Sequence, residues 1–305
     1  MARSGLWLHR FAVLTASCTF LLIIAGALVT GNEAGLAVPD WPLSYGSLMP
    51  PMVGNIRYEH GHRMIASFVG FLTVILAVWI WRKEDRRFVR RLGGLALAAV
   101  VAQGILGGIT VLFFLPVPVS VAHACLAQAF FCLVVSLAVL TSNTWNTPLL
   151  PDRPGDAEAA GLLQRYCWWL TAAIYVQLIL GAALRHSKSG VLLHVLGALA
   201  VAFLVSCVLS LSRPFRLVST IRLPAVLLGF LLVVQLFLGI SSYLIREASR
   251  DDVQPALSTV SVTTAHLAAG ALILAISVVL TLQTYRLPQS RSLTPHYARR
   301  EEALS

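Results

Sequence analysis

Long apolar runs separated by short polar segments follow one another along almost the whole chain. Eight of these runs approach or exceed the length of about 20 residues that an α-helix needs to cross the hydrocarbon core of a bilayer. The clearest run, from Met64 to Trp81, contains no charged residue. The eight runs cover roughly residues 11–30, 62–81, 92–115, 119–141, 166–184, 190–212, 223–245 and 259–283. This pattern predicts an all-α, polytopic membrane protein with eight transmembrane helices.

The composition supports the same fold class. Hydrophobic residues make up 57% of the 305 residues and charged residues 12%, which leaves too little polar surface for a soluble globule of this size. All five cysteines fall inside predicted helices and none has C-x-x-C spacing, so we interpret them as small apolar residues. The first apolar run follows a basic start, as a signal peptide does, but it is long enough to span a membrane and we expect it to be retained.

The distribution of positive charge predicts the topology. A net charge of +10 is also found in nucleic-acid-binding proteins, but 17 of the 23 Lys and Arg residues lie in the two terminal segments and in alternate loops, whereas the intervening loops hold five. This asymmetry is typical of the positive-inside rule. We therefore expect both termini to be cytoplasmic, four helices to begin at the outer face, and no nucleic-acid partner.

A repeated motif indicates an internal duplication. The segments QGILGG, QLILGA and QLFLGI share the pattern Q-x-x-L-G near the outer ends of the third, fifth and seventh predicted helices. The helix after each motif carries a histidine in its first turns, at His123, His194 and His266 respectively. The first predicted helix has a degenerate version around Gly26 that lacks the glutamine, and His62 follows it.

The spacing of these features supports a duplication rather than chance. His62 and His194 are 132 residues apart, as are Gly107 and Gly239. We therefore predict two pseudo-symmetric four-helix bundles. The predicted divisions are an N-terminal half at 1–141, a cytoplasmic linker at 142–165, a C-terminal half at 166–285 and a cytoplasmic tail at 286–305.

The four histidines suit haem ligation, because haem iron takes imidazole as an axial ligand. A lone histidine in a membrane helix often only hydrogen-bonds a neighbouring helix, but four at equivalent depths favour two bis-histidine metal sites. No third protein ligand accompanies either pair, so other metals fit poorly. A small residue lies four positions after each histidine, on the same helix face, where a flat macrocycle would pass: Ala66, Ala127, Ala198 and Gly270. The remaining histidines are expected to have solvated roles: His9, His60, His186 and His296.

The two halves are chemically unequal. Three residues before the four histidines stand Glu59, Ser120, Val191 and Thr263, of which Glu59 alone is ionisable. Intramembrane carboxylates are usually functional, so Glu59 is a candidate general base or electrostatic stabiliser, with a structural partnership with Arg63 as the alternative. Arg63 itself is a possible partner of a haem propionate, or it snorkels to the lipid headgroups.

Together these residues resemble the haem A synthases, over about residues 11–283. The similarity lies in GALVTGNEAGLAVPDWPLSYG, in the E-x-x-H-R pattern of YEHGHR, and in the four histidines. It implies oxidation of a haem O methyl group to a formyl group, through an alcohol, to give haem A for cytochrome oxidase. It also implies that His62 and His123 hold the substrate haem, that His194 and His266 hold haem b, and that Glu59 is needed for activity.

The resemblance implies further properties. They are a location in the bacterial plasma membrane, an external electron donor, contacts with haem O synthase and oxidase assembly factors, and homo-oligomerisation. Many bacterial members carry a cysteine pair in the first outer loop, where this chain has Val38 and Ser44. We therefore expect a cysteine-free loop that is closed by packing.

Two other functions fit parts of the pattern. A bis-histidine haem b protein that only transfers electrons explains four histidines but not the unequal halves. A transporter explains repeats and intramembrane ionisable groups but predicts no bound haem. The haem A synthase interpretation accounts for both the histidines and the asymmetry.

Overall fold

The computed structural model describes residues 2–149, 156–187, 189–249 and 254–287. These residues form eight long α-helices, each long and apolar enough to cross a membrane. Their bounds are α1 Ala2–Gly31, α2 Ile56–Lys83, α3 Arg87–Leu112, α4 Val117–Leu140, α5 Asp156–Ser187, α6 Val191–Leu211, α7 Ser219–Ala248 and α8 Leu257–Thr284. The predicted fold class is confirmed, and the protein is a multi-pass membrane protein.

All the helices except α6 begin before the apolar runs that predicted them. Helix α6, Val191–Leu211, is one residue shorter than its run at each end, and α3 ends at Leu112, three residues before the end of its run. Helix α5 begins at Asp156, ten residues before the predicted span, so the end of the expected linker at 142–165 is helical. The polar residues that open α5 favour helix, but an apolar run marks the part of a helix that lies in the hydrocarbon. Residues 150–155 of that linker, and 288–305 of the expected tail, lie outside the described residues.

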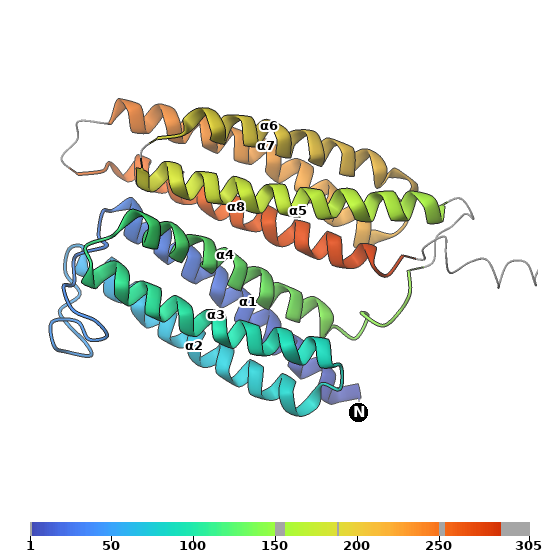
Figure 1. Ribbon diagram of the computed structural model, residues 1–305, viewed down its shortest axis with the longest axis horizontal. Coiled ribbons are helices and arrows are strands. Elements are labelled where there is room, and N and C mark those ends of the chain that lie inside the picture. The colour runs from blue at the N-terminus through green and yellow to red at the C-terminus, as the bar shows by residue number, and fades with distance from the viewer. Residues whose placement is uncertain (1, 150–155, 188, 250–253, 288–305) are drawn as a thin grey trace, which may run out of the picture.

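The helices form two groups of four, seen one above the other in Figure 1. In each group, helices that follow one another in sequence are in contact and the first also contacts the fourth, which closes a ring. In the described part of the chain, the backbones of the diagonal pairs α2 with α4 and α6 with α8 do not approach closely. Helices α1 and α4 of the first group meet α5 and α8 of the second. This arrangement is consistent with two pseudo-symmetric bundles.

Each bundle has its own apolar core, and a third cluster joins them. In this joining cluster Ile23 of α1, Phe131 of α4 and Ala271 of α8 are all buried. Many large apolar side chains instead point outward, as Phe203 and Phe237 do, which is the surface that a helix presents to lipid. The five cysteines are buried or half-buried, with free thiols, as expected of small apolar residues.

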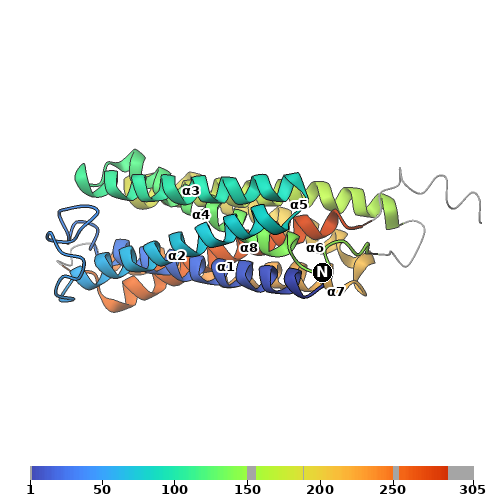
Figure 2. The same ribbon diagram turned by 90° about the horizontal axis from the view of Figure 1, so that it is seen from below.

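The connections sort the chain into two ends. The segment 32–55 between α1 and α2 lies at one end of the bundle, and the start of α1 and the end of α8 lie at the other (Figures 1 and 2). The first residues of α1 and the last residues of α8 therefore lie on the same side of the membrane-spanning region. The four predicted ligand histidines lie in the first turns of α2, α4, α6 and α8, which begin at the end that carries segment 32–55.

Candidate functional site

The structure brings the histidines together in pairs across each bundle. The rings of His194 on α6 and His266 on α8 lie with their centroids 6.4 Å apart and their planes at 70°. His62 on α2 and His123 on α4 are near enough to interact electrostatically. Each pair comes from the two diagonal helices of its bundle. The two pairs therefore come from corresponding helices of the duplicated frame.

The spacing of the C-terminal pair fits a single metal ion between two imidazoles. A metal–imidazole bond of about 2 Å on each side, added to the ring radii, places the ring centroids about 6 Å apart. Among the described residues no group of three or more His, Cys, Asp or Glu side chains is placed to hold a metal. Two imidazoles without a further protein ligand would suit a haem, because the macrocycle supplies the remaining donor atoms to the iron.

Buried ring nitrogens also indicate a missing partner. The Nδ1 atoms of His62, His123 and His266 are buried and have no hydrogen-bond partner. Leaving a buried polar atom unpaired costs about 1–3 kcal/mol. These atoms therefore support a site that is completed when a group is bound.

A glycine on the preceding helix seats each of the four imidazoles. A methyl group on Gly26, Gly181 or Gly239 would lie 3.0 to 3.1 Å from Cε1 of the histidine ring and would press on it. At Gly107 the distance is 3.5 Å, which is ordinary contact. The motif Q-x-x-L-G marks these glycines in the sequence, but its spacing did not reveal this role. The four pairs are Gly26 with His62, Gly107 with His123, Gly181 with His194 and Gly239 with His266.

Replacing Gly181 with alanine should displace the ring of His194, because the added methyl group would lie 3.1 Å from its Cε1 atom. Overpacking of this kind typically costs about 1–3 kcal/mol. We expect a lower haem-to-protein ratio after purification, measured by absorbance. Gly104→Ala is the control, since nothing lies within 4 Å of a methyl group there. Equal haem content in both variants would contradict the seating role.

The glutamines of the motif hold the histidine-bearing helices. Gln103 Nε2 donates a hydrogen bond to the backbone carbonyl of His123 at 3.1 Å, and Gln177 Nε2 donates to that of His194 at 2.8 Å. Gln235 lies against Gly270, one turn after His266. The interpretation of Gly270 as room for a macrocycle is therefore wrong, because Gln235 and Leu178 occupy the space beside it.

Glu59 is buried and holds the outer segment in place. One carboxylate oxygen accepts a hydrogen bond from Arg63 Nη2 at 2.5 Å, and the other accepts from the backbone N–H of Val38 at 2.8 Å. Nη1 of Arg63 donates to the carbonyls of Asp40 and Leu43, both at 2.8 Å. The structural partnership between Glu59 and Arg63 is thus present. Both terminal nitrogens of Arg63 are occupied by these contacts, so Arg63 does not extend to the lipid headgroups.

Packing closes the segment 32–55 over the first bundle. Val38 and Ser44 are both fully buried, and Ser44 Oγ is hydrogen-bonded to Nδ1 of His60 at 2.8 Å. The ring of Trp41 lies directly against Gly108 of α3. The expected cysteine-free closure is therefore what the structure has. The expectation of a solvated His60 is wrong, since this residue is 5% exposed.

Asp40 closes a turn in the same segment by accepting hydrogen bonds from the backbone N–H groups of Tyr45 and Gly46. The bond from Gly46, with that from Tyr45, lowers the pKa of Asp40 below the ordinary value of an aspartate. A lowered pKa means that the turn is intact at neutral pH and weakens as the pH falls below that value. We expect Asp40→Ala to speed amide hydrogen exchange in this segment at neutral pH, measured by mass spectrometry. Leu48→Ala, at an exposed side chain, should match the wild type, and equal protection in both variants would contradict this role.

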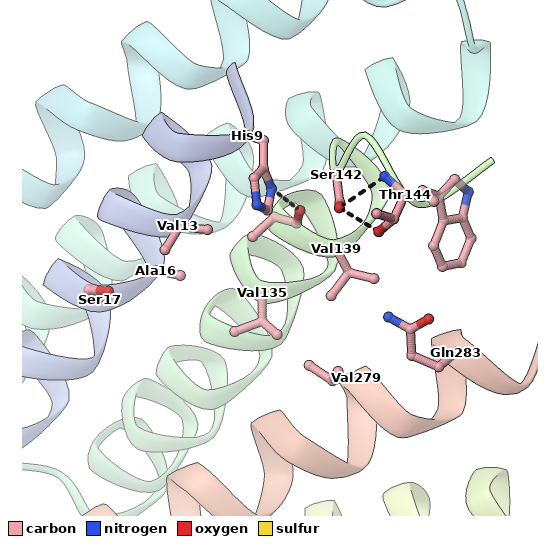
Figure 3. A pocket seen from close by; sticks show the side chains of 12 residues that line it. His9, Val13, Ala16, Ser17, Val135, Val139, Ser142, Thr144, Val279 and Gln283 are labelled. Carbon is pink, nitrogen blue, oxygen red and sulfur yellow. Dashed lines mark hydrogen bonds between the residues drawn. The ribbon is translucent and has the colours of Figure 1, made fainter. Parts of the chain in front are cut away.

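A separate hollow of about 320 Å³ lies among α1, α4 and α8. Figure 3 shows His9 and Gln283 at its edge, with Val13, Val135 and Val279 along its wall. His9 Nδ1 is 2.8 Å from the carbonyl oxygen of Ala138. The hollow lies toward the end of the bundle where α1 begins and α4 ends, and none of the four ligand histidines lines it. It is therefore separate from the candidate site.

Comparison with known proteins gives consistent matches. Residues 54–196 match the model of a family described as cytochrome oxidase assembly protein, COX15-CtaA. This region contains Glu59, His62, His123 and His194 and ends before His266. The chain is 30% identical over 192 residues to the haem A synthase of Lysinibacillus sphaericus, covering 61% of this chain and 60% of that protein.

Other haem A synthases match to a similar extent. That of Halalkalibacterium halodurans is 30% identical over 198 residues, covering 60% of this chain and 62% of the relative. That of Symbiobacterium thermophilum is 28% identical over 182 residues, covering 59% of each chain. The matches thus span about three fifths of the length of these relatives. They confirm the resemblance that the sequence motifs indicate.

Proposed function

We propose that the protein is a haem A synthase, a membrane oxidoreductase that converts a methyl group of haem O to a formyl group through an alcohol. The observation that carries the proposal is the pairing of four glycine-seated histidines across two bundles, with one buried carboxylate beside the first pair. The similarity to haem A synthases supports it. An electron carrier or a transporter does not need this difference between the halves.

The two pairs have different tasks in this proposal. His62 and His123 hold the substrate haem O, and His194 and His266 hold a resident haem b. Iron and oxygen chemistry supplies the oxidation of the methyl group, which protein side chains alone do not provide. The chain contributes binding, orientation and exclusion of water. The segment 32–55, packed over the first bundle, suits the last of these tasks.

Glu59 is the proposed catalytic residue. Its carboxylate has about four lone-pair positions, and the hydrogen bonds from Arg63 and Val38 use two of them. These two bonds fix the orientation of the group and leave it able to accept a proton or to stabilise positive charge at the methyl carbon. Arg63 then acts by positioning Glu59 and the outer segment. Pairing of Arg63 with a haem propionate would require it to exchange one of these contacts.

The remaining parts of the proposal concern the setting of the enzyme. We place it in the bacterial plasma membrane, with both termini in the cytoplasm and the histidine pairs toward the outer face, because positive charge is concentrated at the other end. Haem O and haem A are its substrate and product. An external electron donor, haem O synthase, oxidase assembly factors and a second copy of the chain are the proposed partners.

Co-expression with a haem O synthase tests the proposed function. Cells making haem O and this protein should accumulate haem A or the alcohol, identified by extraction and chromatography. Cells with haem O synthase alone, and cells with the double variant H62A/H123A, serve as controls. Bound haem without either product would favour the electron carrier, and absence of haem would favour the transporter.

A further inference from the structure

His62 is held differently from the other three ligand histidines. In the repeats before His123, His194 and His266, a glutamine precedes the seat glycine by four residues. In the repeat before His62 the seat glycine is Gly26, and the equivalent position is Leu22. The ring of His62 therefore has its glycine seat, but no glutamine ties its helix to the preceding one.

The glutamine is a strong tie where it is present. Gln103 and Gln177 each bond the backbone carbonyl of the ligand histidine itself, at 3.1 and 2.8 Å. The Oε1 atoms of Gln103, Gln177 and Gln235 are buried without a partner. Burying an amide oxygen without a hydrogen-bond partner costs free energy. A glutamine at three equivalent positions despite this cost indicates that its contact with the histidine-bearing helix is important. A direct tie to the ligand backbone limits movement of the imidazole.

The backbone next to His62 is also more flexible. Gly61 precedes it, whereas Ala122, Leu193 and Ala265 precede the other three histidines. Nothing lies within 4 Å of a methyl group placed on Gly61, so packing does not require a glycine there. Glycine inside a helix allows backbone conformations that alanine does not. Glu59 and Arg63 tie this part of α2 to segment 32–55. The missing glutamine and Gly61 leave His62 itself without a bond from the preceding helix to its backbone.

We infer that the ligands of the N-terminal pair are unequal: His123 is the permanent ligand of the substrate iron, and His62 is the one that detaches when the porphyrin enters or leaves. The inference rests on the proposed function. A substrate site must release its haem, which one detachable ligand allows. In the C-terminal pair Gln177 bonds the carbonyl of His194, and Gln235 lies against Gly270, one turn after His266. A glutamine of the preceding helix thus lies against each of the two helices, and this suits a haem that stays bound.

Single alanine variants of the four histidines test the inference in cells making haem O. Haem O and its oxidation products report the N-terminal pair, and haem b reports the C-terminal pair. We expect His62→Ala to keep most of its haem O-type pigment in a five-coordinate state, and His123→Ala to lose it. His194→Ala and His266→Ala should lower haem b equally. Equal loss in the two N-terminal variants, or greater loss in His62→Ala, would overturn the inference.

A second measurement uses variants that keep all four ligands. Carbon monoxide binds reduced haem only when an axial histidine detaches, so its binding rate reports that step. We expect Gly61→Ala to slow binding at the haem O site about two- to five-fold, and Gly70→Ala on the same helix, also in open space, to leave it unchanged. Equal rates in both variants and the wild type would overturn the inference. Wild-type protein without haem O-type pigment would overturn the proposed function instead.

Discussion

Replacement of His194 or His266 with alanine is expected to remove haem b from the purified protein and to stop product formation. The two rings lie 6.4 Å apart across the second bundle, so both would hold the iron of the proposed haem b. Loss of a partner of a metal ligand typically costs 10- to 100-fold in affinity, and loss of the ligand itself should cost at least about as much. The measurement is the absorption spectrum together with the haem b content of the extract.

His186 provides the matched control for these variants. It lies on α5, near the same end of the bundle, and it is half-buried like the ligands. No glycine seat on another helix holds its ring among the described residues. His186→Ala should therefore keep the wild-type spectrum. A wild-type spectrum in His194→Ala and His266→Ala as well would show that this pair does not ligate haem.

Replacement of Glu59 with glutamine should abolish formation of the alcohol and of haem A while haem loading stays near the wild-type level. The amide is similar in size, and its oxygen can accept the hydrogen bond from Arg63, but its NH2 group cannot accept from the backbone N–H of Val38. The segment 32–55 should therefore lose one hydrogen bond and keep its contacts with Arg63. The amide carries no negative charge and is a far weaker base. Loss of a general base typically lowers the rate by about 10²- to 10⁴-fold. The measurement is product per bound haem in cells making haem O.

Arg63→Gln separates catalysis from closure of the outer segment. Arg63 donates hydrogen bonds to Glu59 and to the carbonyls of Asp40 and Leu43, so its loss should open the segment and speed its proteolysis. Glu59→Gln should be cleaved much more slowly than Arg63→Gln, because it keeps the contacts of Arg63 with Asp40 and Leu43, and it should form no product. If Glu59→Gln instead forms product at the wild-type level, Glu59 has no catalytic role. If it opens the segment as Arg63→Gln does, its role is structural.

The fold was predictable because its determinants are local. Each transmembrane helix needs about 20 apolar residues, and the run from Met64 to Trp81 identifies α2 without any knowledge of its neighbours. The pairing of the four histidines was predictable for another reason. Because of the duplication, His62 lies as far before Gly107 as His194 lies before Gly239. One half of the sequence could therefore be compared with the other.

The contacts between segments were not predictable from such patterns. The burial of His60 depends on how segment 32–55 folds back to bring Ser44 to its ring, and an irregular segment has no periodicity that predicts this. The role of Gly239 required knowledge of which helix faces His266. The prediction that Gly270 makes room for a macrocycle was wrong for the same reason. Spacing along α8 does not show that Gln235 of α7 lies beside this glycine.

The haem content per chain tests the central claim most directly. Protein purified from cells that also make haem O should contain two haems per chain, one haem b and one of the haem O type, measured as pigment extracted per amount of protein. The double variant H62A/H123A should keep only haem b, and H194A/H266A should keep only the haem O type. Colourless protein, or two haems in either double variant, would contradict an iron porphyrin held by one histidine pair in each bundle.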